Sequence, residues 1–249
     1  MGTSTIFTWI LIAGAIAVSA FAVVLVRRVR AEVESRYRRT EAWLAILGVL
    51  RPRAPFGPTG PWIASPELLH DLVLIIFETR PQRVLELGSG MSTLVCAYAL
   101  EAVGQGGKII SLDHDDRFAE TTRRQLRMHG LDGIATVLHA PLRTTTTDVG
   151  AQSWYGVPDE ALRGPIDLLI VDGPPGGGER LARYPALPVL RSHLAVGAVI
   201  VVDDARRPGE QEIVERWHRA HPDFTVQHRA SEKGTAILRH VTTADEPAR

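Results

Sequence analysis

Residues 83–94 read RVLELGSGMSTL, and this stretch combines an apolar β-type run, a glycine turn and the start of a helix. Gly88 and Gly90 form the turn, and an apolar helical pattern follows them. Glycines let a backbone approach a ligand closely, and the N-terminus of the next helix favours negative charge. The stretch predicts a strand–turn–helix unit with a ligand at the turn, although two glycines alone also suit a purely structural turn.

Short apolar runs alternate with helical patterns on both sides of this unit. The predicted strands are residues 83–87, 108–113, 134–139, 166–171, 198–202, 224–228 and 235–239. The predicted helices are residues 66–80, 92–103, 117–129, 181–194 and 209–220, with a weaker pattern around 155–162. Continuously apolar strands separated by helices indicate a parallel sheet covered on both faces, and the short break before the last strand indicates an antiparallel pair. The predicted fold is α/β, with a doubly wound, mostly parallel seven-stranded sheet.

Two carboxylates accompany the glycine turn. Glu86 precedes the first glycine, where it can meet a cationic group. Asp113 ends the next predicted strand, where a carboxylate can accept hydrogen bonds from both hydroxyls of a ribose. Thr93 stands where the dinucleotide-binding pattern has its third glycine, which disfavours a nicotinamide cofactor.

Five segments in order extend this pattern: VLELGSGMSTL, ISLDHDDRF, IDLLIVDGPP, AVGAVIVVDDARR and EKGTAIL. Over about residues 61–240 the sequence resembles the class I S-adenosylmethionine-dependent methyltransferases, and it is most similar to the group that includes the catechol and caffeoyl-CoA O-methyltransferases. The resemblance implies S-adenosylmethionine as cofactor. It implies that Asp113 holds the ribose, that His114 lies beside the adenosine and that Pro141 lies near the adenine. The implied neighbours of the amino-acid portion are Glu86, Gly88, Ser89, Gly90 and Ser92.

Three aspartates follow two neighbouring predicted strands. Asp172 comes after LLIV, and Asp203 and Asp204 come after VIVV. Carboxyl ends of parallel strands meet at one edge, so these side chains are expected to converge, and a divalent cation such as Mg²⁺ would relieve their repulsion. The resemblance implies the same three positions as metal ligands, although the third ligand of the family is usually Asn. Capping of loops is the alternative role for Asp203 and Asp204.

The proton of the acceptor hydroxyl needs a base. The family often places a lysine shortly after the first aspartate, whereas this chain has Pro174-Pro175-Gly176, so Asp172 is the candidate catalytic residue. Three further pairs are expected near the same edge: Trp154-Tyr155 as a pocket wall, and Arg183-Tyr184 and Arg206-Arg207 as sites for an anionic group. For each pair, ordinary packing or a solvated charge is the alternative.

An uncharged run, IFTWILIAGAIAVSAFAVVLV, covers residues 6–26 and has the length of a membrane-spanning helix. Arg27, Arg28 and Arg30 follow it, so the positive-inside rule places the body in the cytoplasm. A cleaved signal peptide is the alternative, but its charges would precede the run. We predict an anchor at 1–28, a helical and Pro/Gly-rich linker at 29–60, a methyltransferase domain at 61–241 and a tail at 242–249.

Charge and composition narrow the function. Residues 27–53 carry eight arginines against three glutamates in a chain of zero net charge, so the body is net acidic and nucleic-acid binding is not expected. A single cysteine excludes an intramolecular disulfide framework. The sequence thus predicts a membrane-anchored enzyme that methylates a hydroxyl of a small molecule or of an envelope or lipid-linked precursor. A non-catalytic scaffold with this fold and an aminopropyltransferase are the alternatives.

Overall fold

The computed structural model describes residues 2–57 and 64–241 and divides the chain into two compact units, Met1–Glu41 and Ala42–Arg249. The predicted start of the methyltransferase domain at residue 61 and the predicted tail at 242–249 lie outside the described residues. The predicted division at residues 28 and 60 therefore stays a prediction.

The first unit belongs to one continuous helix, α1 (Thr3–Leu50). The sequence predicts a membrane-spanning run at 6–26 and a partly helical linker from residue 29. No proline interrupts the chain before Pro52, and one helix runs through both. Its apolar side chains are exposed in the first unit, with Trp9 66% and Phe21 69% accessible. Within the described residues, α1 is the one helix long and apolar enough to cross a membrane.

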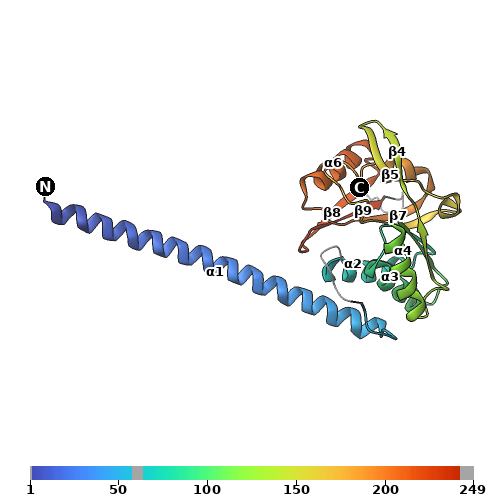
Figure 1. The fold of residues 1–249 in the computed structure, drawn as a ribbon, viewed down its shortest axis with the longest axis horizontal. Coiled ribbons are helices and arrows are strands. Elements are labelled where there is room, and N and C mark those ends of the chain that lie inside the picture. The colour runs from blue at the N-terminus through green and yellow to red at the C-terminus, as the bar shows by residue number, and fades with distance from the viewer. Residues whose placement is uncertain (1, 58–63, 242–249) are drawn as a thin grey trace, which may run out of the picture. The chain divides into compact units, whose positions relative to one another are not determined.

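The second unit is built on a seven-stranded sheet in the order β3-β2-β1-β6-β7-β9-β8. Figure 1 labels β7, β9 and β8 of this sheet. Its parallel strands are β1 (Arg83–Leu87), β2 (Lys108–Asp113), β3 (Ala135–His139), β6 (Ile166–Val171) and β7 (Leu194–Val202). The last two strands, β8 (Phe224–Arg229) and β9 (Thr235–His240), pair antiparallel, and β9 also pairs antiparallel with β7. The α/β class and the mostly parallel seven-stranded sheet are confirmed.

Helices cover both faces of this sheet. One apolar core contains α2 (Pro66–Thr79), α3 (Met91–Val103) and α4 (Asp116–Met128), and the other contains α5 (Ala186–Leu190) and α6 (Pro208–Ala220). Alternation along single strands explains the division: in β6, Leu168 lies in the first core and Leu169 in the second. The sheet is therefore doubly wound, as the sequence predicts.

The end of α1 belongs to the second unit. Ile46 and Leu50 are buried in the first core. The segment after the helix is also held, because Arg53 donates from its backbone N–H to the Tyr98 hydroxyl at 2.8 Å and from Nε to the His129 carbonyl at 2.7 Å. These contacts hold Ile46, Leu50 and Arg53 on the second unit.

Two segments differ from their expected structure. The prediction of a helix near 155–162 is wrong, because only a 3₁₀ turn forms there, at Asp159–Leu162. An unpredicted hairpin of β4 (Leu142–Thr147) and β5 (Gly150–Tyr155) precedes that turn. The long helix expected at 181–194 is also wrong. Only α5 and a 3₁₀ turn, Arg191–His193, form there, because Pro185 and Pro188 cannot donate the backbone hydrogen bonds of a longer helix.

Candidate active site

The candidate site lies at the carboxyl edge of four neighbouring parallel strands. Gly88 follows β1, His114 follows β2, Asp172 follows β6 and Asp203 follows β7. The order β2-β1-β6-β7 makes β1 the strand where the winding reverses, because β2 and β3 lie on one side of it and β6 and β7 on the other. Open α/β sheets bind their ligands at such a point.

A tight glycine turn closes β1. Gly88 has φ 114°, which an L side chain rarely adopts, and its N–H donates to the Leu112 carbonyl at 2.8 Å. A Cβ on Gly88 would stand 3.6 Å from the Cβ of Asp172. Gly90 begins the helix, and its N–H donates to Thr93 Oγ1 at 3.0 Å. The turn therefore lies directly against the first aspartate of the neighbouring strand.

Glu86 lies beneath this turn and is fully buried. Its Oε2 accepts hydrogen bonds from the hydroxyls of Thr93, at 2.6 Å, and Ser111. Its Oε1 has no hydrogen-bond partner among the described residues. Burial raises the pKa of the Glu86 carboxyl, and hydrogen bonds from Ser111, Ser92 and Thr93 oppose this rise only in part.

Asp113 lies at the end of β2 and is 5% exposed. Its Oδ2 accepts a hydrogen bond from the Ser89 hydroxyl at 2.6 Å, and its Oδ1 accepts one from the Asp115 backbone N–H at 3.0 Å. The His114 ring is near, with Nδ1 3.6 Å from the same Oδ1. We call Glu86, Ser89 and Asp113 the glycine-turn half of the site.

The remaining predicted cofactor residues lie around this half. Ser92 is buried in the first turn of α3. Pro141 is exposed after β3, and its carbonyl accepts a hydrogen bond from the Gly156 N–H at 3.0 Å. The structure thus places the predicted residues next to the ends of β1, β2 and β3, with Pro141 the farthest along the sheet edge.

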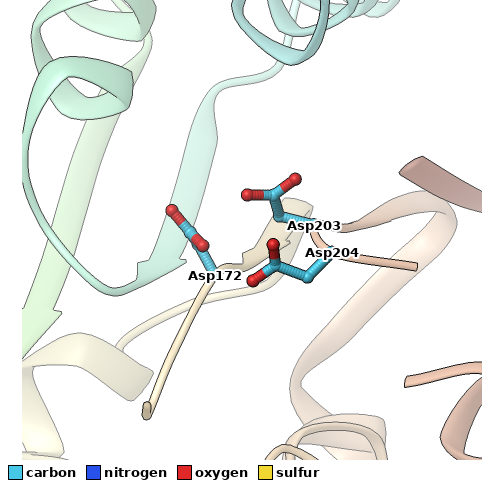
Figure 2. A group of neighbouring side chains, drawn as sticks. All are labelled: Asp172, Asp203 and Asp204. Carbon is cyan, nitrogen blue, oxygen red and sulfur yellow. The ribbon is translucent and has the colours of Figure 1, made fainter. Parts of the chain in front are cut away.

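The three aspartates lie close together at the ends of β6 and β7 (Figure 2). One carboxylate oxygen from each of Asp172, Asp203 and Asp204 lies within 4.8 Å of the others. Asp203 and Asp204 are buried, whereas the Asp172 side chain keeps 22% of its surface exposed. Burial and the neighbouring carboxylates raise the pKa of Asp172 and of Asp203. We call these three residues the aspartate half of the site.

Arg183 occupies a position in this half that its sequence context did not indicate. It was considered a contact for an anionic ligand, but it is only 4% exposed and its guanidinium lies among the aspartates. Its Nη2 lies 3.1 Å from Asp204 Oδ2 and 3.7 Å from Asp172 Oδ1, and its Nη1 donates to the Asp203 carbonyl at 3.1 Å. Arg207 reaches Asp204 Oδ2 as well, at 2.8 Å. No periodic pattern in the sequence signals this burial.

The three aspartates offer the oxygen ligands that a divalent cation prefers, but the guanidinium of Arg183 already lies among them. Both oxygens of Asp203 and Oδ1 of Asp204 are buried without a hydrogen-bond partner in the described part of the chain, and hard cations prefer such oxygens. Asp172 Oδ1 and Asp204 Oδ2, however, already face the buried guanidinium of Arg183, and that charge would repel a divalent ion in the same place. With Arg183 in place, the three aspartates do not fit a tightly held metal ion.

Tyr155 stands between the two halves. It ends β5, it is 3% exposed, and a Cβ on Gly173 would overlap its hydroxyl. Burial and the charges of Asp113 and Asp172 raise its pKa, so the phenol stays protonated. Its partner in the predicted pocket wall, Trp154, is buried in the second core.

Comparison with known proteins agrees with this geometry. A family model described as a methyltransferase domain matches residues 85–205, which include both halves of the site. No curated protein matches the sequence.

Several solved structures share the fold. An O-methyltransferase from Bacillus cereus in complex with S-adenosylhomocysteine (SAH) aligns with a TM-score of 0.58 and 16% identity, over 84% of this chain and 97% of that one. An SAH-bound methyltransferase from Podospora anserina aligns with a TM-score of 0.59 and 14% identity, over 86% of this chain and 96% of that one. The O-methyltransferase TomG from Streptomyces achromogenes, which is involved in tomaymycin synthesis and was solved with S-adenosylmethionine, aligns with a TM-score of 0.53 and 18% identity, over 72% of this chain and 82% of that one.

Two similarities describe this protein. Residues 85–205 match the model of a methyltransferase domain, and the second unit has the fold of methyltransferases of known structure. Its fold is that of O-methyltransferases of known structure, to which a long apolar N-terminal helix is joined.

Proposed function

We propose that this protein transfers the methyl group of S-adenosylmethionine to a hydroxyl of a small molecule or of an envelope or lipid-linked precursor. The observation that carries the proposal is the meeting of the glycine-turn half and the aspartate half at the strand where the sheet reverses its winding. A methyl donor held by one half is then next to an acceptor held by the other. Such positioning is the main task of the protein, because the sulfonium of the cofactor is already a good leaving group.

The glycine-turn half is proposed to hold the cofactor. Among the described residues, the hydrogen-bond donors to the Asp113 carboxylate are the Ser89 hydroxyl and the Asp115 N–H, which carry no charge, so ribose hydroxyls can replace or join them. Glu86 keeps Oε1 free of any partner among the described residues, which suits the cationic amino group of the cofactor through a direct contact or a water. Ser92 and the turn N–H groups surround the same amino-acid portion, His114 lies beside the adenosine, and Pro141 lies toward the adenine.

Asp172 is proposed to take the proton from the acceptor hydroxyl. It is the aspartate nearest the glycine turn, and it keeps part of its surface exposed while Asp203 and Asp204 are buried. A carboxylate at the junction of the two halves is within reach of an oxygen that attacks the methyl group. Mg²⁺ or another divalent cation at Asp172, Asp203 and Asp204 is the alternative that the sequence suggests, and it would have to share these carboxylates with Arg183.

The apolar helix is proposed to anchor this domain to the cell membrane with the domain in the cytoplasm. The support is the length and apolar character of α1 together with Arg27, Arg28 and Arg30, which follow the apolar run. Protease added to intact spheroplasts should leave the domain uncut, and protease added after lysis should cut it. Cleavage before lysis would contradict this orientation, and loss of residues 1–28 in the purified chain would identify a signal peptide.

Titration of the full chain in detergent with S-adenosylmethionine tests the cofactor. We expect saturable binding in the micromolar range, with SAH competing at the same site. Decarboxylated S-adenosylmethionine in a parallel titration identifies an aminopropyltransferase if it binds more tightly. If a folded chain binds neither compound, the methyltransferase proposal is wrong and the scaffold alternative replaces it.

A further inference from the structure

We propose that the guanidinium of Arg183 is the resident cation of the three aspartates, so that this protein positions its methyl acceptor without a divalent metal ion. The inference rests on the proposed function, because it concerns the aspartate half of the same site. It names Arg183 as a positioning residue, acting through Asp172 and Asp204.

Arg183 contacts all three aspartates from a buried position. Its Nη2 approaches Asp204 and Asp172 at 3.1 and 3.7 Å, and its Nη1 donates to the backbone carbonyl of Asp203 at 3.1 Å. Its Nε points to the Pro174 carbonyl at 3.4 Å and lies 3.8 Å from Glu210 Oε1. A guanidinium stays charged in proteins and presents its donors in a fixed fork, so it sets the directions of two carboxylates as a metal ion would.

The backbone that carries Arg183 is held in place. The next residue, Tyr184, donates from its hydroxyl to Asp148 at 2.8 Å and accepts the Trp217 indole N–H on its carbonyl at 3.0 Å. The Arg183 carbonyl itself accepts a hydrogen bond from the Ala186 N–H at 3.1 Å. These bonds fix the backbone at Arg183 and Tyr184, so the Arg183 side chain starts from a defined position beside the aspartates.

Charge in the cluster supports the same conclusion. Arg207 binds Asp204 from outside, and the charge of Lys233 acts on Asp203. A divalent ion that entered here would meet the positive charges of Arg183 and Arg207 beside Asp204, although the Glu210 carboxylate lies 3.8 Å from Arg183 Nε. Without the Arg183 guanidinium, in contrast, carboxylate oxygens of all three aspartates would lie close together without that counter-charge, as a metal ion requires.

Calorimetric titration of the full chain in detergent with Mg²⁺, and separately with Mn²⁺, tests the inference. We expect no saturable uptake by the wild type up to about 10 mM ion, and S-adenosylmethionine binding unchanged by EDTA within about twofold. The Arg183→Met variant should gain metal uptake by at least about tenfold, and Asp203→Asn added to it should abolish the gain. Arg180→Met is the matched control, because Arg180 is exposed and pairs with Glu212 outside the cluster.

Stoichiometric metal uptake by the wild type that Asp203→Asn abolishes would overturn the inference, as would an Arg183→Met chain that folds and gains no uptake. If Arg183→Met does not fold, Arg183→Lys keeps the positive charge and should resist metal as the wild type does. Metal uptake by Arg183→Lys with a Kd of about 1 mM or tighter would then contradict the proposal. Failure of the proposed function is recognised separately, because the wild type would then not bind S-adenosylmethionine with or without EDTA.

Discussion

The two halves of the candidate site compensate buried carboxylates in different ways. In the glycine-turn half, hydroxyls and a backbone N–H bond to Glu86 and Asp113, and these donors carry no net charge. In the aspartate half, a buried guanidinium approaches Asp172 and Asp204. Neutral donors leave the negative charge of a carboxylate available to a ligand, whereas a resident cation neutralises it. The first half is therefore suited to exchange partners with a cofactor, and the second to stay fixed.

Replacing the resident cation should have the largest effect. Arg183→Ala leaves buried carboxylates without their counter-charge, so we expect the free energy of unfolding to fall by about 3–5 kcal/mol. Urea unfolding of the full chain in detergent, followed by tryptophan fluorescence, measures this. Arg180→Ala removes only an exposed ion pair with Glu212 and should cost less than about 1 kcal/mol. Equal losses in the two variants would show that Arg183 does not hold the aspartate half.

Removing the ribose acceptor should come next. Asp113→Ala should weaken S-adenosylmethionine binding by about 30- to 100-fold, or about 2–3 kcal/mol, because charge-assisted hydrogen bonds are lost. Asp203→Ala, in the other half, should change that binding by less than about threefold. Isothermal titration of both variants is the measurement. A comparable loss of affinity in both variants would mean that the cofactor is not bound by the glycine-turn half alone.

The buried glutamate should make stability depend on pH. Its folded-state pKa is raised above the ordinary value of 4.5, so its contribution to stability is fully present below that value and is lost as pH rises through the raised pKa. Relative to Glu86→Gln, the wild type should therefore lose about 1 kcal/mol or more of unfolding free energy between about pH 4 and about pH 8. Urea unfolding of both chains across this range is the measurement, and a difference independent of pH would contradict the raised pKa.

The hydroxyl that holds Asp113 should have the smallest effect. Ser89→Ala removes the 2.6 Å hydrogen bond to Asp113 Oδ2, but Asp115 N–H still orients the carboxylate. We expect S-adenosylmethionine to bind about three- to tenfold more weakly, which corresponds to one ordinary hydrogen bond. Titration of this variant beside Asp113→Ala measures the difference. A loss as large as that of Asp113→Ala would make Ser89 a direct ligand of the cofactor.

Local patterns predicted the sheet and the convergence of the aspartates. The strands of the sheet are continuous apolar runs, and parallel strands bring their carboxyl ends to one edge. That rule is sufficient to place Asp172 beside Asp203 and Asp204. The hairpin at 142–155 was not predicted, because LRTTTT is polar and its Trp154-Tyr155 end is buried only through contact with distant strands.

Sequence alone was sufficient for the apolar helix, the α/β class, the glycine turn and the acidic strand ends, because each depends on residues close together in the chain. The environment of Arg183 depended on the folded chain. Its partner Asp204 lies 21 residues away, and a single arginine in a loop is ordinarily a solvated charge. Arg183 becomes buried among carboxylates when the loop after β6 packs against the end of β7. A charge can be buried only beside partners, and here those partners come from two different strands.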